Sequence, residues 1–468
     1  MTDRHIDTTD ASGKGEPMST ETLRATIRSL MPQAKADLAR MVSFKSVHDP
    51  QQFPPAECQR MVDFLVGAFT DVGLRDVEGY ETPDGSQAVC GHKPGPPGSP
   101  TVLLYFHHDV QPPLDDAAWE TPAWDLTERN GRWYGRGAAD CKGNIATHLT
   151  ALRALGDDLP VGIKIVGEGS EEQGTGGLEA FVPEHADLLG ADAILVCDAG
   201  NFAVGVPSLT TSLRGLANVW VTVRALSGPM HSGMFGGAAP DALAALIAML
   251  ATLRDEHGNT TIRGLDATQT WNGAPYPPDQ FRKDANVLDG VDLLGDAVAD
   301  MIWARPTVTV LGIDCPPVIG SSAAIQPEAR ARINLRVPPG MNAKQAQTAL
   351  IEHLASVAPW HVKVDFEREA DGDPFVGTLN GPGFEAMTTA MRDAYGRDVV
   401  TQGQGGSIPL CNVFAETFPK AEIMLMGVEE PLCLIHAPNE SVDPTEIENM
   451  AMVEALFLQN YAAAAARS

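Results

Sequence analysis

Imidazole and carboxylate side chains follow several short apolar segments of this sequence. His107 and Asp109 come directly after the segment VLLYF, and their spacing places both side chains on the same side of an extended chain. Further groups of this kind lie in loops near apolar segments: Asp140, Glu168, Glu171, Glu172, Asp198 and His436. Oxygen and imidazole donors in this ratio suit zinc, manganese or cobalt better than a metal that prefers thiolates. The set therefore predicts metal-dependent chemistry.

The candidate ligands are too numerous for one catalytic zinc ion, which usually takes about three protein ligands and a water. They suit two metal ions about 3.5–4 Å apart that share a bridging carboxylate. Taken alone, each carboxylate could be a turn residue or a helix cap, and His436 could be a buried, hydrogen-bonded histidine. A phosphate-binding loop is the competing interpretation of GEGSEEQG, but this segment lacks the Gly-Lys-Ser/Thr ending and its carboxylates would repel phosphate. The metal site is favoured because these imidazole and carboxylate residues occur together at the ends of successive apolar segments.

The apolar segments that precede these residues have the length and composition of strands buried on both faces of a helix-covered sheet. They are 102–106, 163–166, 193–197 and 423–426. Open α/β sheets bind their ligands at the carboxyl ends of the strands, so we expect the candidate ligands to meet there. A helical pattern from Leu23 to Val42 precedes them, and Pro32 should kink this helix or start a second one. These features predict an α/β fold with a mixed sheet.

The middle of the chain carries a different pattern, in which apolar and polar residues alternate as in strands with one solvent face. The predicted strands are 219–223, 307–311, 330–337 and 362–367, and the predicted helices are 243–253 and 342–354. Their β-α-β-β-α-β order indicates a small α+β unit inserted into the larger one. We place a mobile tail at 1–18, a discontinuous catalytic domain at 19–210 and 373–468, and the inserted domain at 211–372.

Composition excludes several classes of partner. The 468 residues include 33 basic and 61 acidic side chains, and the net charge of −28 should repel nucleic acid and anionic membrane surfaces. The sequence contains no apolar stretch of the roughly 20 residues that a membrane span needs, and no secretory signal is expected. Seven scattered cysteines without a CxxC pair favour reduced thiols in a cytoplasmic protein.

Four sequence motifs of this chain resemble those of a known protein family. The motifs are HHDVQP (107–112), GRGAADCKG (135–143), EGSEEQG (168–174) and HAPNE (436–440). With them the chain resembles the M20 family of co-catalytic metallopeptidases, in particular the branch of carnosine and cysteinylglycine dipeptidases. The agreement runs from about Met41 to the C-terminus, through both predicted domains.

The resemblance implies a division of labour among the candidate ligands. One metal ion would be held by His107 and Asp198, the other by Glu172 and His436, and Asp140 would bridge both. Asp109 would orient the imidazole of His107. Glu171 would be the general base that activates the bridging water and passes the proton to the leaving amine. The implied cofactors are two divalent ions, zinc first, with manganese or cobalt as alternatives.

The resemblance also implies substrate-binding residues. His231, in a segment similar to the family motif HSGxxGG, would reach the active site of a partner subunit and stabilise the tetrahedral oxyanion, which implies a homodimer through the inserted domain and a lid role for that domain. Arg336 would hold the free carboxylate of the substrate, because a guanidinium fork suits that task. Gly406 and Ser407, in GGSIP, would contact the same carboxylate.

Some positions depart from the family pattern. His107 is followed by a second histidine, and His107 is assigned as the ligand because it has the HxD spacing. Ala323 stands where the dipeptidases often have a substrate-binding threonine. Cys141 and Cys197 neighbour the proposed ligands, and we interpret them as core residues.

These observations predict a hydrolase that cleaves the amide bond of dipeptides with a free C-terminal carboxylate. An N-acyl amino acid amidohydrolase, such as a deacetylase or desuccinylase of the same family, is an alternative with the same chemistry. A non-catalytic relative that keeps the fold for binding is the alternative from another class. Glu171 argues against the last, because a binding protein has no need of a base beside the metal.

Overall fold

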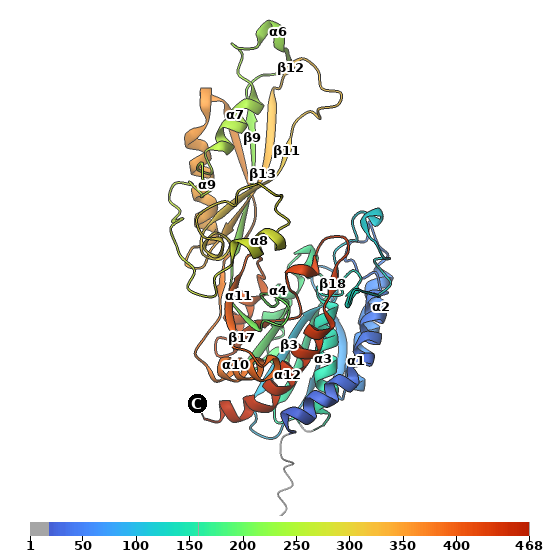
Figure 1. Ribbon diagram of the computed structural model, residues 1–468. Coiled ribbons are helices and arrows are strands. Elements are labelled where there is room, and N and C mark those ends of the chain that lie inside the picture. The colour runs from blue at the N-terminus through green and yellow to red at the C-terminus, as the bar shows by residue number, and fades with distance from the viewer. Residues whose placement is uncertain (1–17, 158, 468) are drawn as a thin grey trace, which may run out of the picture.

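The computed structural model describes residues 18–157 and 159–467. They form a larger part built on a nine-stranded sheet and a smaller part built on a four-stranded sheet, which stands above it in Figure 1. The predicted tail at 1–18 lies, apart from Met18, outside the described residues. Within the described chain, the helices are too short or too polar to cross a membrane.

The large sheet is mixed, in the order β1-β2-β6-β3-β7-β17-β8-β15, with β16 paired to β8. Its strands are β1 (Arg75–Glu81), β2 (Gln87–Lys93), β3 (Thr101–His107), β6 (Gly162–Glu168), β7 (Ala193–Cys197), β8 (Ser208–Leu213), β15 (Phe375–Val376), β16 (Val400–Gln404) and β17 (Glu422–Met426). β6, β3, β7 and β17 run parallel to one another in the centre. The central apolar segments are buried almost throughout, so the predicted mixed α/β sheet is confirmed.

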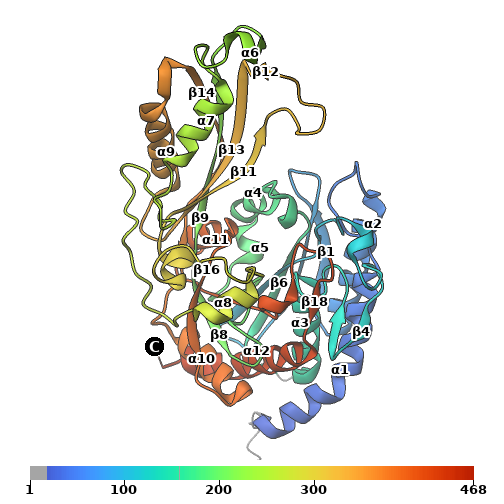
Figure 2. The same ribbon diagram turned by 45° about the horizontal axis from the view of Figure 1, so that its top comes forward.

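Helices cover both faces of the large sheet. One face packs against α1 (Thr20–Val42), α2 (Pro55–Asp71), α3 (Lys142–Leu155), α10 (Pro382–Tyr395) and α12 (Pro444–Ala465), and the other against α4 (Gly177–Glu184), α5 (Ala186–Leu189) and α11 (Leu410–Thr417). Figure 2 shows α1, α3 and α12 together on one side. Pro32 lies inside α1, which continues as one helix instead of dividing there.

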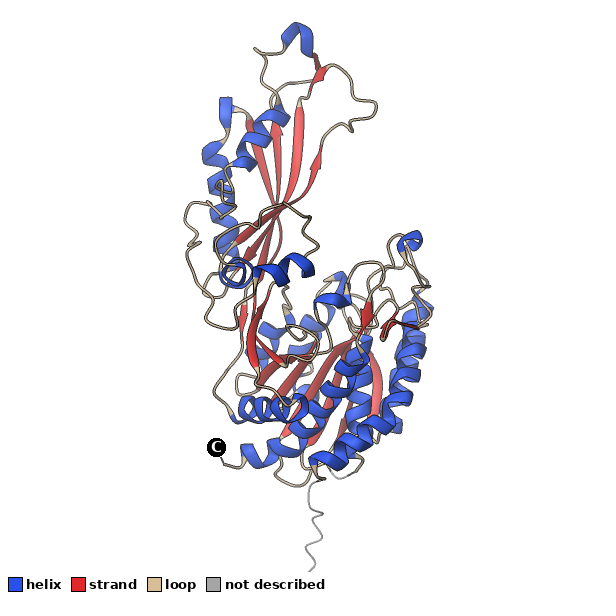
Figure 3. Ribbon diagram, in the orientation of Figure 1, coloured by secondary structure: helices blue, strands red, loops and turns tan. Residues whose placement is uncertain are grey.

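The small sheet is antiparallel, in the order β11-β13-β9-β14. Its elements follow the predicted β-α-β-β-α-β order: β9 (Gly215–Arg224), α7 (Ala242–Ala251), β11 (Thr307–Asp314), β13 (Glu328–Val337), α9 (Ala343–Val357) and β14 (Lys363–Gly372). Both helices pack on one face, and the other face is open (Figure 3). A long segment between α7 and β11, which contains α8 (Pro278–Asp284) and a π-helix (Asp300–Ala304), was not foreseen.

Smaller elements complete the chain. They are β4 (Thr127–Arg129), β5 (Arg132–Tyr134), β10 (Met230–His231), α6 (Ser232–Phe235), β12 (Ala324–Ile325), β18 (Ser441–Val442) and four 3₁₀ turns at Asp116–Ala118, Glu171–Gln173, Pro359–His361 and Pro431–Cys433. β10, α6 and β12 form the far tip of the smaller part (Figure 1). The domain division at 210 and 372 stays a prediction, and β8 crosses its first boundary.

Candidate metal centre and active-site cleft

Asp140 lies between two imidazoles at the carboxyl edge of the large sheet. Its Oδ1 is 2.8 Å from Nε2 of His107, and its Oδ2 is 3.0 Å from Nε2 of His436. The side chain is buried and uses a different oxygen toward each histidine. A carboxylate in this position has the geometry needed to bridge two cations.

Each imidazole has a second carboxylate beside it. Asp198 Oδ1 is 3.4 Å from Nε2 of His107, and Glu172 Oε2 is 3.0 Å from Nε2 of His436. The structure therefore brings together all five predicted ligands, in the two halves that the family resemblance implies. The assignment of these residues as metal ligands stays a prediction.

The charges at this edge require a counter-charge. Burial, and then the charge of Asp140, raises the pKa of Glu172 to about 7, and burial also raises the pKa of Asp198. Buried carboxylates this close to one another are unfavourable unless cations compensate them. Oxygen and imidazole donors converging on one point fit divalent metal ions, and Asp140, Glu172 and His436 form one group that could hold such an ion.

The strands and their loops position these side chains. His107 is the last residue of β3, and Asp198 directly follows β7, its parallel neighbour. Glu172 lies in the 3₁₀ turn that follows β6, the neighbour on the other side. The carboxyl ends of adjacent parallel strands meet at one edge, which is why residues far apart in sequence converge here.

Asp109 holds two parts of the centre together. Its carboxylate accepts hydrogen bonds from the backbone N–H groups of Glu171 and Glu172, both at 3.1 Å. The same carboxylate lies 3.5 Å from Nδ1 of His107. Asp109 is fully buried, so it fixes the glutamate turn and the imidazole against the same point.

Two further residues that position the ligand group were not predicted from the sequence. Gln111 donates through its backbone N–H to Oε1 of Glu172 at 3.2 Å and through Nε2 to Oε2 at 2.9 Å. Glu440 accepts the backbone N–H groups of Gly137, Ala139 and Asp140 and pairs with Arg136 at 2.7 Å. Both residues belong to motifs quoted above, HHDVQP and HAPNE, and that membership was the only signal of their role.

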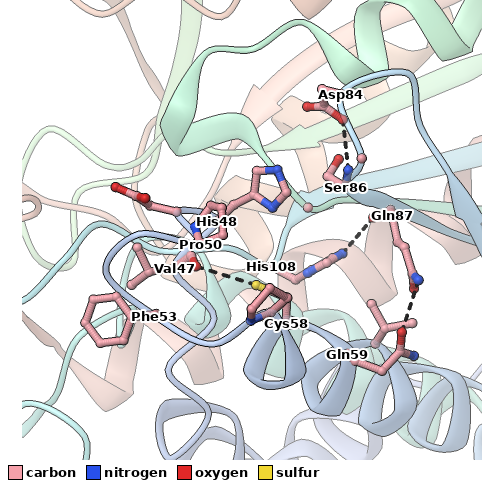
Figure 4. A pocket seen from close by; sticks show the side chains of 15 residues that line it. Val47, His48, Pro50, Phe53, Cys58, Gln59, Asp84, Ser86, Gln87 and His108 are labelled. Carbon is pink, nitrogen blue, oxygen red and sulfur yellow. Dashed lines mark hydrogen bonds between the residues drawn. The ribbon is translucent and has the colours of Figure 1, made fainter.

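His108 points away from the centre. Its Nε2 faces the backbone oxygen of Gln87 at 3.1 Å, so this nitrogen donates there. The ring lines a separate pocket that also contains Cys58 and Asp84 (Figure 4). This geometry supports His107 as the ligand of the histidine pair.

Both cysteines beside the centre belong to groups that could hold a metal ion. Cys141 lies within ligand distance of His107 and Asp198, while its thiol donates to the backbone oxygen of Cys197 at 2.9 Å. Cys197 is buried in the core, next to His148 and Glu454. Burial raises the pKa of Cys141 to about 12, so without a nearby cation this thiol stays protonated. The interpretation of both as core residues stays a prediction.

A cleft of about 670 Å³ opens over the centre, between the large sheet and the open face of the small one. Glu171, Glu172 and His436 line its floor, and Ser407 lines its wall. The side chain of Glu171 makes no hydrogen bond with a described residue, although its backbone is held by Asp109. A free carboxylate beside the ligand group has the placement expected of a general base.

Other predicted substrate residues lie outside this lining. His231 is exposed in β10, which pairs with β12 and directly precedes α6, the helix at the far tip in Figure 1. Arg336 lies on β13 near the junction of the two sheets, and Arg332 of the same strand, paired with Glu369, lines the cleft instead. Gly406 precedes Ser407 in the loop after β16. One chain alone thus leaves His231 away from the metal centre.

Comparison with known proteins identifies the family. The model of peptidase family M20/M25/M40 matches residues 103–460. The chain belongs to this family. It is therefore a hydrolase of the metallopeptidase type, as the motifs predicted.

The matched relatives extend over nearly the whole chain. A cysteinylglycine-S-conjugate dipeptidase of Corynebacterium striatum is 44% identical over 434 residues, which cover 91% of this chain and 94% of the relative. The Cys-Gly metallodipeptidase dug1 of Schizosaccharomyces pombe is 29% identical and covered to 95%. The crystal structure of human carnosine dipeptidase 1 shares the fold, with a TM-score of 0.81 over 95% of this chain and 100% of that one at 24% identity.

Proposed function

We propose that this M20-family chain is a dipeptidase that uses two divalent metal ions, zinc first, with manganese or cobalt as alternatives. The observation that carries the proposal is the grouping of two imidazoles and two further carboxylates about Asp140, with the free carboxylate of Glu171 in the same cleft. The names of the relatives, which include cysteinylglycine and carnosine dipeptidases, support a dipeptide substrate.

In this proposal His107 and Asp198 hold one ion, His436 and Glu172 hold the other, and Asp140 bridges them. When bound, such ions supply Lewis acidity, which polarises the scissile carbonyl and lowers the pKa of water. Asp109, Gln111 and Glu440 keep the ligands in place through the hydrogen bonds described above.

Glu171 moves the proton. It accepts a proton from the attacking water and returns it to the leaving amine, so the carboxylate is regenerated after each cycle. Its backbone is fixed by Asp109 while its side chain is free of hydrogen bonds with the described residues. This combination suits a group that must approach first the water and then the amine.

The substrate is held by the remaining predicted residues. Arg336, Gly406 and Ser407 receive the C-terminal carboxylate, and Ser407 already lines the cleft. His231 would arrive from the partner subunit of a homodimer formed through the inserted domain, because within one chain it lies at the far tip. The seven cysteines are all unpaired, which supports a reducing, cytoplasmic location.

The test is a substrate panel on protein reconstituted with zinc, manganese or cobalt and checked for metal content. Cysteinylglycine and carnosine represent dipeptides, and N-acetyl and N-succinyl amino acids represent the amidohydrolase alternative. We expect two metal equivalents per chain and hydrolysis of a dipeptide. Turnover of the acylated compounds alone would contradict the dipeptidase proposal, and a metal-loaded protein without any turnover would indicate the binding relative.

A further inference from the structure

Two arginines lie close together at the junction of the two sheets. Arg214 is the single residue between β8 of the large sheet and β9 of the small one. Its backbone N–H donates to the oxygen of Gln404 at 3.1 Å, and its Nη1 donates to Oγ1 of Thr307 at 2.7 Å. Arg336, on β13, pairs in register with Thr307 on one side and Leu216 on the other.

Neither guanidinium has a carboxylate partner among the described residues. Arg214 is only 8% exposed, and its buried Nε lacks a hydrogen-bond partner. The side chain of Arg336 makes no hydrogen bond or ion pair with the described part of the chain. Burial, and then the charge of Arg336, lowers the pKa of Arg214 to about 9, and burial lowers the pKa of Arg336. The two cations thus lie near enough to repel each other, and neither is paired with a carboxylate of the described residues.

Other buried arginines of this protein are compensated. Arg305, also 8% exposed, pairs with Asp296 at 2.6 Å and with Asp300 at 3.1 Å. Arg136 pairs with Glu440 at 2.7 Å. A buried cation without a counter-ion is costly, and two side by side are more so. In a chain with 61 acidic residues, this unpaired site is complementary to an anion that comes from outside.

The free end of Arg214 faces the loop that leads into the cleft. A Cβ atom at Gly405 would lie 2.9 Å from Nη2 of Arg214, so glycine at this position allows the guanidinium to approach the loop backbone. Two residues later, Ser407 lines the cleft over the metal centre. An anion held between the two arginines would therefore sit beside the loop proposed to bind the substrate.

We propose that Arg214 is a second cation of the subsite that receives the C-terminal carboxylate of the substrate, acting together with Arg336. The inference rests on the proposed function for the identity of the anion. Because Arg214 joins the two sheets, the bound carboxylate also neutralises like charges at their junction.

The test compares a good dipeptide substrate with its C-terminal amide, used as a competitive inhibitor, in the metal-loaded enzyme. In Arg214→Met we expect the KM of the dipeptide to rise roughly 10- to 100-fold, because the substrate loses one charge-assisted hydrogen bond. The change in kcat should be smaller. The Ki of the amide should stay unchanged, since it presents no negative charge. Arg214→Lys, which keeps the charge, should recover part of the loss.

Arg305→Met is the matched control, because it removes a buried arginine of the same region that already has its own carboxylates. Any effect of Arg305→Met should raise the KM of the dipeptide and the Ki of the amide by the same factor. Equal losses for dipeptide and amide in Arg214→Met, or in Arg214→Lys where the methionine variant does not fold, would overturn the inference. If only N-acyl amino acids are hydrolysed, the proposed function fails, while the same comparison of acid with amide still decides the role of Arg214.

Discussion

The carboxyl edge of the large sheet and the open face of the small sheet are prepared for the substrate to different degrees. At the first, buried hydrogen bonds already fix the ligand group, with Asp109 and Glu440 each accepting more than one backbone N–H. On the second, the side chain of Arg336 makes no hydrogen bond or ion pair with the described residues, and His231 is exposed beyond this face, in β10 at the far tip. The proposed catalytic half is thus preorganised within one chain, whereas in the proposed recognition half Arg336 lacks such contacts with the described residues.

The largest effect should come from the preorganised half. Glu171→Gln keeps the size of the side chain but removes the base, so kcat should fall about 10²- to 10⁴-fold. Metal content should stay the same, because Glu171 is not among the ligands. Glu179→Gln, which alters another carboxyl group lining the cleft, is the control. Steady-state kinetics and metal analysis check both, and unaltered turnover in Glu171→Gln would mean that the base is wrongly assigned.

The two halves should also differ in how much their ion pairs contribute to stability. Arg136→Gln leaves the fully buried Glu440 without its partner, so the free energy of unfolding should fall by about 3–5 kcal/mol. Arg224→Gln on the small sheet removes an exposed partner of Glu328, so the free energy of unfolding should change far less. Urea unfolding of the metal-loaded proteins measures both. Equal losses would contradict the contrast between the two regions.

His231 tests whether the recognition half is completed by a partner. His231→Ala should lower kcat about 10²- to 10³-fold if the imidazole stabilises the oxyanion. A mixed dimer of His231→Ala with Glu171→Gln regains one complete site if the histidine acts across the interface. Activity should therefore reappear when the two inactive variants are mixed and allowed to exchange subunits. Full activity of the wild type as a monomer at high dilution would refute the role in trans.

The smallest change concerns the support of one ligand. Gln111→Leu removes the amide hydrogen bond to Glu172, so affinity for the metal should fall about 10- to 100-fold while kcat at saturating metal changes less. Gln173→Leu, one residue after Glu172 and exposed, is the control. The zinc affinities of the two variants are compared by titrating each apoprotein with zinc and measuring the activity that returns. An unchanged zinc affinity in Gln111→Leu would show that Glu172 needs no such support.

The sequence allowed part of the proposed metal group to be placed, because His107 and Asp198 lie at the ends of buried strands, whose position follows from apolar patterning, whereas Asp140 and His436 lie in loops and were singled out by their motifs. Gln111 and Glu440 were within known motifs, but their hydrogen bonds depend on tertiary contacts that no local pattern encodes. Arg214 carried no signal, since an unpaired cation is recognised only by the absence of neighbouring acids in space. Pro32 does not start a second helix, one of the two outcomes predicted for it, because packing of α1 maintains a helix that local propensity would divide.

The link between Glu440 and the loop of Asp140 has a consequence for biosynthesis. The two residues are 300 positions apart, and the whole inserted unit lies between them. While the chain is being made, the loop that carries Asp140 leaves the ribosome long before its acceptor. The proposed metal site can therefore assemble only after Glu440 has also left the ribosome, which delays metal loading until the inserted unit has emerged.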